Sequence, residues 1–193
     1  MANPALKPPI FDDMEALEDR DGLRYELWRN EPVAMTGGTS AHNLITLALH
    51  RLLDDQLKLP CVAYAADMAL KLQPDAYSDK AYPDGMVVCD PLPGKYQTDP
   101  VLVAEVLSES TVKRDRGDKW LAYTALPSLE VYLIISQTAA HVEVCRRATG
   151  WKREDYLGLE AVIELPQPVL TIPLAGIYAK VLALGLLGLE KPA

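Results

Sequence analysis

The sequence predicts an α/β (α+β) fold with a mixed central β-sheet flanked by helices. Three observations favour this class: short apolar segments typical of strands recur along the chain, amphipathic helical segments lie between them, and a β-hairpin pattern occurs near each end. The chain has 193 residues, of which 49% are hydrophobic and 24% are charged, so it can bury the core of one ordinary domain. We expect a single domain over residues 1–193, with an N-terminal arm at 1–20 and a C-terminal helix at 174–193.

The first sixty residues predict a hairpin followed by a longer helix. The expected elements are a short helix at about 12–17, strands at 24–28 and 32–35, and a helix at about 41–57. Thr39 or Ser40 can cap the longer helix, in which leucines recur at helical spacing. Pro60 prevents that helix from continuing.

The rest of the chain predicts a buried sheet with one internal helix. The expected elements are strands at 62–72, 85–89 and 101–107, a helix at 113–125, a strand at 129–135, a hairpin at 141–147 and 151–157, and a helix from about 174. Residues 101–107 show almost no alternation, which indicates a central strand covered on both faces. The helix at 113–125 is amphipathic and ends before Pro127.

Charge and cysteine content limit the classes of function. A formal net charge of −8 argues against a surface built entirely to hold nucleic acid, so any such binding must be local. Cys61, Cys89 and Cys145 stand far apart without a CxxC pair. We therefore expect neither a zinc ribbon nor a disulfide framework, and interpret the cysteines as small core residues.

The two ends of the chain predict neither a secretory signal nor a membrane span. The N-terminus has no basic segment followed by an apolar run. The apolar stretch at 174–189 is broken by Lys180 and is shorter than a bilayer span normally requires. We expect a cytoplasmic protein without a membrane partner.

Two acids interrupt apolar strand segments. Asp84 precedes the run Gly-Met-Val-Val-Cys, and Glu105 lies inside Val-Leu-Val-Ala-Glu-Val-Leu. An ionised carboxylate inside an apolar strand is unfavourable unless it is paired or coordinated. Adjacent strands lie about 4.8 Å apart, so two such acids can contact one cation. A single acid, in contrast, more often caps a strand end or pairs with an arginine.

Three further positions can contribute to such a site, each with a plain structural alternative. Asp115 and Lys119 are four residues apart on one helical face, a spacing that is usually a solvated surface pair. His42 begins the long helix and can contact substrate, an ion or a carboxylate, or serve only as a hydrogen-bonded structural residue. Glu26 can reach a metal, or pair with Arg24 or with another strand.

Together, these segments resemble the Uma-two branch of the PD-(D/E)XK nuclease superfamily, a group of restriction endonuclease-like proteins. The resemblance runs through most of the chain, and its order and spacing are more specific than any one piece. It is carried by Tyr25-Glu26-Leu27, His42, Tyr82-Pro83-Asp84, Val103-Ala104-Glu105-Val106-Leu107-Ser108, Asp115 with Lys119 and Tyr123, and Glu130-Val131-Tyr132.

The resemblance implies a restriction endonuclease-like core and a metal-dependent endonuclease that hydrolyses phosphodiester bonds in DNA. It assigns Asp84, Glu105 and the backbone carbonyl of Val106 to Mg²⁺ or Mn²⁺, and places Lys119 near the attacking water. The sequence departs from the superfamily pattern at Leu107, where a lysine is expected. In the resembled branch the lysine comes from the following helix. That position is Lys119 here, with Lys113 as the substitute if the helix begins elsewhere.

Residues around this predicted centre complete the expectation. Glu26, His42 and Asp115 are possible supporting residues for catalysis. A local basic cluster, Lys113, Arg114 and Arg116, can hold a phosphate backbone or form a solvated helix start. Trp120 and Tyr123 have the spacing of core residues.

A second class of function is open at this point: a catalytically inactive nuclease-like module that binds a protein partner or self-associates. The apolar stripe Ile177, Val181, Leu184 and Leu187 can dock on a second copy as a homodimer or pack within its own chain. GxSxG and GxxxxGKS motifs are absent, so neither an α/β hydrolase nor an organic cofactor is expected.

Overall fold

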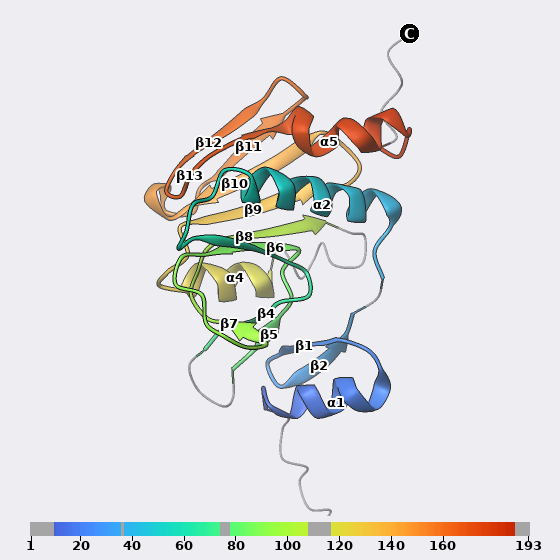
Figure 1. Cartoon of the computed structure of the whole chain (residues 1–193), viewed down its shortest axis with the longest axis vertical. Helices are drawn as coiled ribbons and strands as arrows, with labels where there is room; N and C mark the ends of the chain where they lie inside the picture. The colour runs from blue at the N-terminus through green and yellow to red at the C-terminus, as the bar shows by residue number, and fades with distance from the viewer. Residues whose placement is uncertain (1–9, 36, 74–77, 108–116, 188–193) are drawn as a thin grey trace, which may run out of the picture.

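The computed structural model describes residues 10–35, 37–73, 78–107 and 117–187. Over these residues the chain forms a six-stranded sheet, a five-stranded sheet and a separate two-stranded hairpin, accompanied by four α-helices (Figure 1). The mixed α+β class that the sequence predicts is confirmed. The six-stranded sheet lies between two apolar cores. Glu105 lies in one of its strands, and Asp84 directly precedes another.

The six-stranded sheet has its predicted central strand in the middle. Its strand order is β11 (Arg153–Leu157), β10 (His141–Arg146), β9 (Val131–Ser136), β8 (Pro100–Leu107), β6 (Gly85–Val88) and β3 (Val62–Ala65). Strands β8 and β9 pair in parallel, and the other neighbours pair antiparallel. The sheet is therefore mixed, as expected.

Opposite faces of β8 enter different cores, which explains the missing alternation. Leu102, Ala104 and Val106 belong to an aliphatic core, whereas Val103 packs on the other face with Tyr123 and other aromatic residues. Because successive side chains of a strand alternate between faces, Glu105 lies on the face of Val103. Successive residues of this apolar strand therefore belong to different cores, and Glu105 lies on the face that α4 (Asp118–Ala125) covers.

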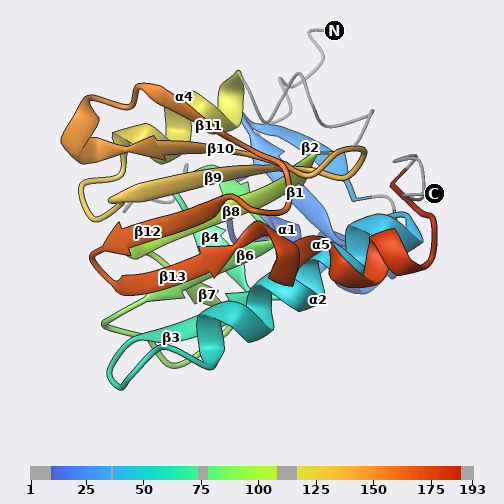
Figure 2. The ribbon, with the colours of Figure 1, turned by 90° about the horizontal axis from the view of Figure 1, so that it is seen from above.

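The aliphatic face is covered by two helices and a hairpin. These are α2 (Ser40–Asp54), α5 (Leu174–Ala183), β12 (Val162–Pro166) and β13 (Val169–Pro173), which lie together on this side of the sheet (Figure 2). The side chain of Thr39 caps α2 by accepting a hydrogen bond from the backbone N–H of His42 at 3.1 Å. The predicted cap thus fixes where His42 emerges.

The five-stranded sheet contains the predicted N-terminal hairpin. Its strand order is β2 (Glu31–Ala34), β1 (Tyr25–Trp28), β5 (Lys80–Ala81), β4 (Ala69–Lys71) and β7 (Tyr96–Gln97), with α1 (Asp13–Asp21) against β1. Trp28 pairs with Glu31, so the turn consists of Arg29 and Asn30, both with positive φ (51° and 66°). Such a two-residue turn matches the twist of a hairpin.

Several predicted boundaries were wrong. The segment 62–72 is not one strand: a turn after Ala65 sends β3 and β4 into different sheets. The break was missed because the residues on both sides of it are mostly apolar and, except for Ala65, the strand residues are buried or half-buried. The first helix continues to Asp21. The β12–β13 hairpin was not predicted at all. The C-terminal helix ends at Ala183 rather than 193, next to Gly185 with φ of 66°.

The interpretation of the cysteines was correct for one residue and wrong for two. Cys145 is buried and free. Cys61 and Cys89 instead form a disulfide. Val62 pairs with Val88 across β3 and β6, so the next residue outward on each strand is a cysteine facing its partner. Only the strand register, which sequence spacing does not give, reveals this pair.

The C-terminal apolar stripe packs within its own chain. Ile177, Val181 and Leu187 are buried in the aliphatic core, and Leu184 is exposed. This packing removes the stripe as the expected docking surface for a second copy. Among the described residues, helices that are long and apolar enough to cross a membrane are absent.

Candidate functional site

Asp84 and Glu105 lie opposite each other across neighbouring strands. Met86 pairs with Val103, and Gly85 pairs with Ala104, in the antiparallel register of β6 and β8. Continuing that register by one residue brings Asp84 opposite Glu105. Side chains at opposed positions project from the same face, about 5 Å apart at Cβ. The register thus sets the two acids on one face, as a shared site requires, and the site itself stays a prediction.

Asp84 is held from two sides. Its Oδ2 accepts a hydrogen bond from the backbone N–H of Val106 at 2.7 Å and lies 3.1 Å from His42 Nε2. The Asp84 side chain is 13% exposed and that of His42 is 20% exposed. The start of α2, the residue just before β6 and the end of β8 thus converge on one carboxylate that solvent can still reach.

The lack of a side chain at Gly38 leaves room for the His42 ring. A Cβ at Gly38 would lie 2.9 Å from His42 Nδ1 and 3.1 Å from His42 Cγ. Real Cβ atoms essentially never approach other heavy atoms that closely. The glycine therefore belongs to the site as the residue that lets the imidazole lie against Asp84.

Glu105 is buried and held by two groups from one helix. Its Oε1 accepts hydrogen bonds from Lys119 Nζ at 3.0 Å and from the Tyr123 hydroxyl at 2.7 Å. Lys119 and Tyr123 are four residues apart on α4, so they share one helical face. The sequence singled out Lys119 but left Tyr123 as a core residue. The shared spacing was the signal for both roles.

Glu26 joins the same buried group from the other sheet. Its Oε1 lies 3.1 Å from Lys119 Nζ, its Oε2 accepts a hydrogen bond from Trp28 Nε1 at 2.9 Å, and the N–H of Tyr82 donates to its Oε1 at 3.3 Å. Arg24, the other candidate partner, instead contacts Asp67 at 3.2 Å. Lys119 is therefore a buried link between two glutamates rather than a solvated surface residue.

The electrostatics of this group keep Tyr123 protonated. Burial raises the pKa of the Tyr123 hydroxyl well above its usual value of 10.0, and the carboxylates of Glu105 and Glu26 raise it further. A neutral phenol donates its proton to Glu105, whereas a phenolate would repel it. Tyr123 therefore acts as a fixed hydrogen-bond donor that orients Glu105.

The chemical composition of the site suits a hard cation. Two carboxylates, those of Glu26 and Glu105, contact Lys119, and a third, that of Asp84 at the neighbouring strand position, contacts His42. Oxygen ligands of this kind are preferred by Mg²⁺ and Mn²⁺. A divalent ion would also offset the excess of acidic over basic groups.

Four predicted residues lie outside the described part of the chain: Lys113, Arg114, Asp115 and Arg116. Their assigned roles stay predictions.

A cavity of about 560 Å³ lies between α1 and the five-stranded sheet, lined by residues that include Glu18, Lys80 and Tyr82. Asp84, Glu105 and Lys119 do not line it, so we assign the chemistry to the acids and not to this cavity.

Comparisons with known proteins agree with this architecture. The Uma2 family model, described as "Putative restriction endonuclease", matches residues 11–175. The uncharacterized protein slr1290 of Synechocystis sp. is 34% identical over 131 residues, covering 66% of this chain and 68% of that protein. The uncharacterized protein sll1609 of Synechocystis sp. is 30% identical over 162 residues, covering 76% and 86%.

A solved structure resembles the fold. It is the crystal structure of "a putative nuclease belonging to DUF820" from Anabaena variabilis, with a TM-score of 0.66, and the match covers 82% of this chain and 91% of that chain. The two sequences are 12% identical, so this likeness bears on the fold alone. It agrees with the predicted nuclease-like core.

Proposed function

The chain belongs to the Uma2 family of putative restriction endonucleases, and on this premise we propose that it is a metal-dependent endonuclease that hydrolyses phosphodiester bonds in DNA. The proposal is supported by the register of β6 and β8, which when continued by one residue sets Asp84 opposite Glu105, and by the hydrogen bond of 3.0 Å from Lys119 to Glu105. Two facing carboxylates with a lysine beside them supply the groups that metal-assisted phosphodiester hydrolysis needs.

Asp84, Glu105 and the carbonyl of Val106 would hold Mg²⁺ or Mn²⁺. A residue in an antiparallel pair directs its N–H and its C=O toward the same neighbour. The N–H of Val106 points to Asp84, which supports a carbonyl on the same side. Continuing the register one step further brings Pro83 opposite Val106, and proline has no N–H to donate to that carbonyl. Such an ion polarises a phosphoryl oxygen and acidifies a bound water.

The protein's own groups would position the reactants. Lys119 lies beside Glu105, so its ammonium can orient the attacking water and stabilise negative charge that develops on the phosphate. Tyr123 and His42 each hold one carboxylate in place, which makes them positioning residues. The basic residues Lys113, Arg114 and Arg116 lie between β8 and α4 in the sequence, and we propose that they contact the DNA backbone.

DNA cleavage tests the proposal with a control on the same strand. Purified protein should nick or cut plasmid DNA with Mg²⁺ or Mn²⁺ and stop when EDTA is added. Asp84→Asn and Glu105→Gln should each abolish cleavage while circular dichroism shows an intact fold. Asp90→Asn should leave cleavage unchanged, because Asp90 is exposed just beyond the opposite end of β6.

Two results would reject the proposal. One is cleavage that persists in both Asp84→Asn and Glu105→Gln. The other is wild-type protein that leaves DNA uncut, whether or not it binds Mg²⁺ or Mn²⁺ in calorimetry. The second result would favour the nuclease-like interaction module, and light scattering would then test the expected homodimer.

A further inference from the structure

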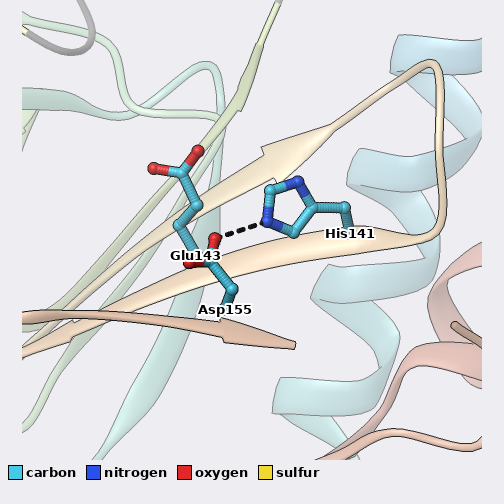
Figure 3. A group of neighbouring side chains, drawn as sticks. All are labelled: His141, Glu143 and Asp155. Atoms are coloured by element: carbon cyan, nitrogen blue, oxygen red, sulfur yellow. Dashed lines mark hydrogen bonds and ion pairs between the residues drawn. The ribbon is translucent and has the colours of Figure 1, made fainter. Parts of the chain in front are cut away.

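We infer that His141, Glu143 and Asp155 form a second cation site, one that takes a zinc-like divalent transition metal ion. This site is independent of the proposed nuclease centre. It is built on β10 and β11, at the edge of the six-stranded sheet (Figure 3). Each of the three residues offers one ligand atom, and these three atoms lie within 4.8 Å of one another.

The strand register places the three side chains on one face. His141 and Glu143 are two residues apart on β10, so they project to the same side. Asp155 is paired directly with Glu143 across the antiparallel β10–β11 ladder, and opposed side chains share a face. The backbone of an edge hairpin therefore holds all three ligands, without help from a loop.

The contacts within the group leave a short path to coordination. His141 Nε2 lies 2.8 Å from Asp155 Oδ1 (Figure 3), and two ligands of a tetrahedral zinc ion are about 3.4 Å apart. Binding of an ion would therefore lengthen the distance between these two atoms by well under 1 Å. Glu143 Oε2 is buried and lies 3.1 Å from Arg153 Nε. The Arg153 side chain is 51% exposed, so it can turn toward solvent when an ion takes the carboxylate.

The donor set selects the class of ion. One imidazole nitrogen with two carboxylate oxygens suits zinc and its neighbours in the first transition row, whereas Mg²⁺ prefers oxygen ligands alone. Three protein ligands leave a fourth position for water or a substrate group. The ligands proposed for the nuclease centre, from Asp84, Glu105 and the Val106 carbonyl, are oxygen atoms alone, so the two sites would differ in metal preference.

The position of the group on the sheet distinguishes it from a second ion of the nuclease centre. Glu105 and Glu143 are both paired with Ile134 of β9, which puts two strand spacings, about 10 Å, between them. Paired catalytic ions lie about 4 Å apart. The ion at His141 would therefore act at its own site farther across the same face.

Zinc titration of EDTA-treated, full-length protein tests the inference, with Co²⁺ absorbance as a second readout. Wild-type protein should bind about one zinc ion in calorimetry. His141→Gln and Asp155→Asn should each weaken binding at least about tenfold. His50→Gln is the matched control, because His50 is another half-buried histidine, on α2, and should leave zinc affinity unchanged.

Arg153→Gln separates this inference from a purely structural ion-pair network. It should strengthen zinc binding, because the arginine competes with the ion for Glu143. Asp84→Asn should bind zinc as wild type does, while His141→Gln should still cleave DNA with Mg²⁺, so failure of either proposal leaves the other testable. Wild-type affinity in both His141→Gln and Asp155→Asn, or no zinc binding by wild type, would overturn the inference.

Discussion

Two pairs of facing acids lie in one row across the same sheet face, and their surroundings differ. Continuing the register of β6 and β8 by one residue sets Asp84 opposite Glu105, and Asp155 is paired with Glu143 between β11 and β10. Both glutamates are paired with Ile134, which therefore lies between the two pairs. The order along the row is Asp, Glu, Ile, Glu, Asp.

The contacts repeat as well. In each pair the glutamate contacts a cationic side chain, Lys119 at 3.0 Å or Arg153 at 3.1 Å. In each pair the aspartate contacts a histidine, His42 at 3.1 Å or His141 at 2.8 Å. The backbone arrangement and the residue types are thus nearly the same.

Burial of the cation makes the difference between the two pairs. Lys119 is 5% exposed and bridges two glutamates, whereas Arg153 is 51% exposed. A buried, oriented lysine cannot leave and is fixed beside the proposed reaction centre. An exposed arginine can give way to an ion. The chemical role that we propose for each pair of facing acids therefore depends on how deeply its neighbouring cation is buried.

The largest expected effect distinguishes the two cations. Lys119→Met should lower the free energy of unfolding by about 3–5 kcal/mol, because Glu26 and Glu105 would be left together in a buried place. Arg153→Met should lower it less, by about 1–3 kcal/mol, because it also leaves a buried carboxylate, that of Glu143, but only one such group and not two. Urea denaturation followed by circular dichroism measures both. Equal losses would show that burial does not separate the pairs.

Removal of the Tyr123 hydroxyl tests a contact that is described for Glu105 and not for Glu143. Tyr123→Phe keeps the ring in the core but removes a hydrogen bond to a carboxylate, which should cost about 1.5–3 kcal/mol of stability. Cleavage should fall by up to about 100-fold, because Glu105 loses its orientation. Tyr178→Phe is the control: Tyr178 is buried on the aliphatic side, where its hydroxyl donates to the Ser136 carbonyl.

The outcome for Tyr178→Phe sharpens the comparison. This variant should lose stability but keep the cleavage rate of the folded fraction. Equal cleavage by Tyr123→Phe and wild type would contradict the orienting role of Tyr123.

Sequence patterns predicted the first pair but not the second, for a physical reason. Asp84 and Glu105 each interrupt an apolar run, so they stand out as unfavourable unless paired. Glu143 and Asp155 lie in strands with other polar residues, and only the register of β10 and β11 brings them together. The same limit applied to the disulfide of Cys61 and Cys89. Local periodicity gives elements and faces, but contacts across strands depend on register.

Alkaline unfolding should report on Tyr123. The pKa of Tyr123 is raised in the folded protein by burial and by Glu105, so the folded state keeps this proton at pH values where the unfolded chain has lost it. Its contribution to stability is complete below about pH 10 and decreases as the pH rises above it.

Wild-type protein should therefore lose stability more steeply above pH 10 than Tyr123→Phe does, in urea denaturation at a series of pH values. A residual slope is expected in the variant, since burial also raises the pKa of Tyr178. Identical slopes in the two proteins would contradict the raised pKa of Tyr123.

The smallest effect concerns the histidines that contact the two aspartates. Gly38→Ala should lower cleavage by roughly tenfold, because its Cβ would lie 2.9 Å from His42 Nδ1 and would push the imidazole aside. A misplacement of about 1 Å at an active site can cost about 100-fold in rate, and this shift would be smaller. Gly37→Ala is the matched control, because its Cβ would meet no described atom within 4 Å beyond its chain neighbours. Zinc binding at His141 should be the same in both variants, since the substitutions act only on the first pair. Equal cleavage by Gly38→Ala and Gly37→Ala would show that Asp84 does not depend on His42 for its position.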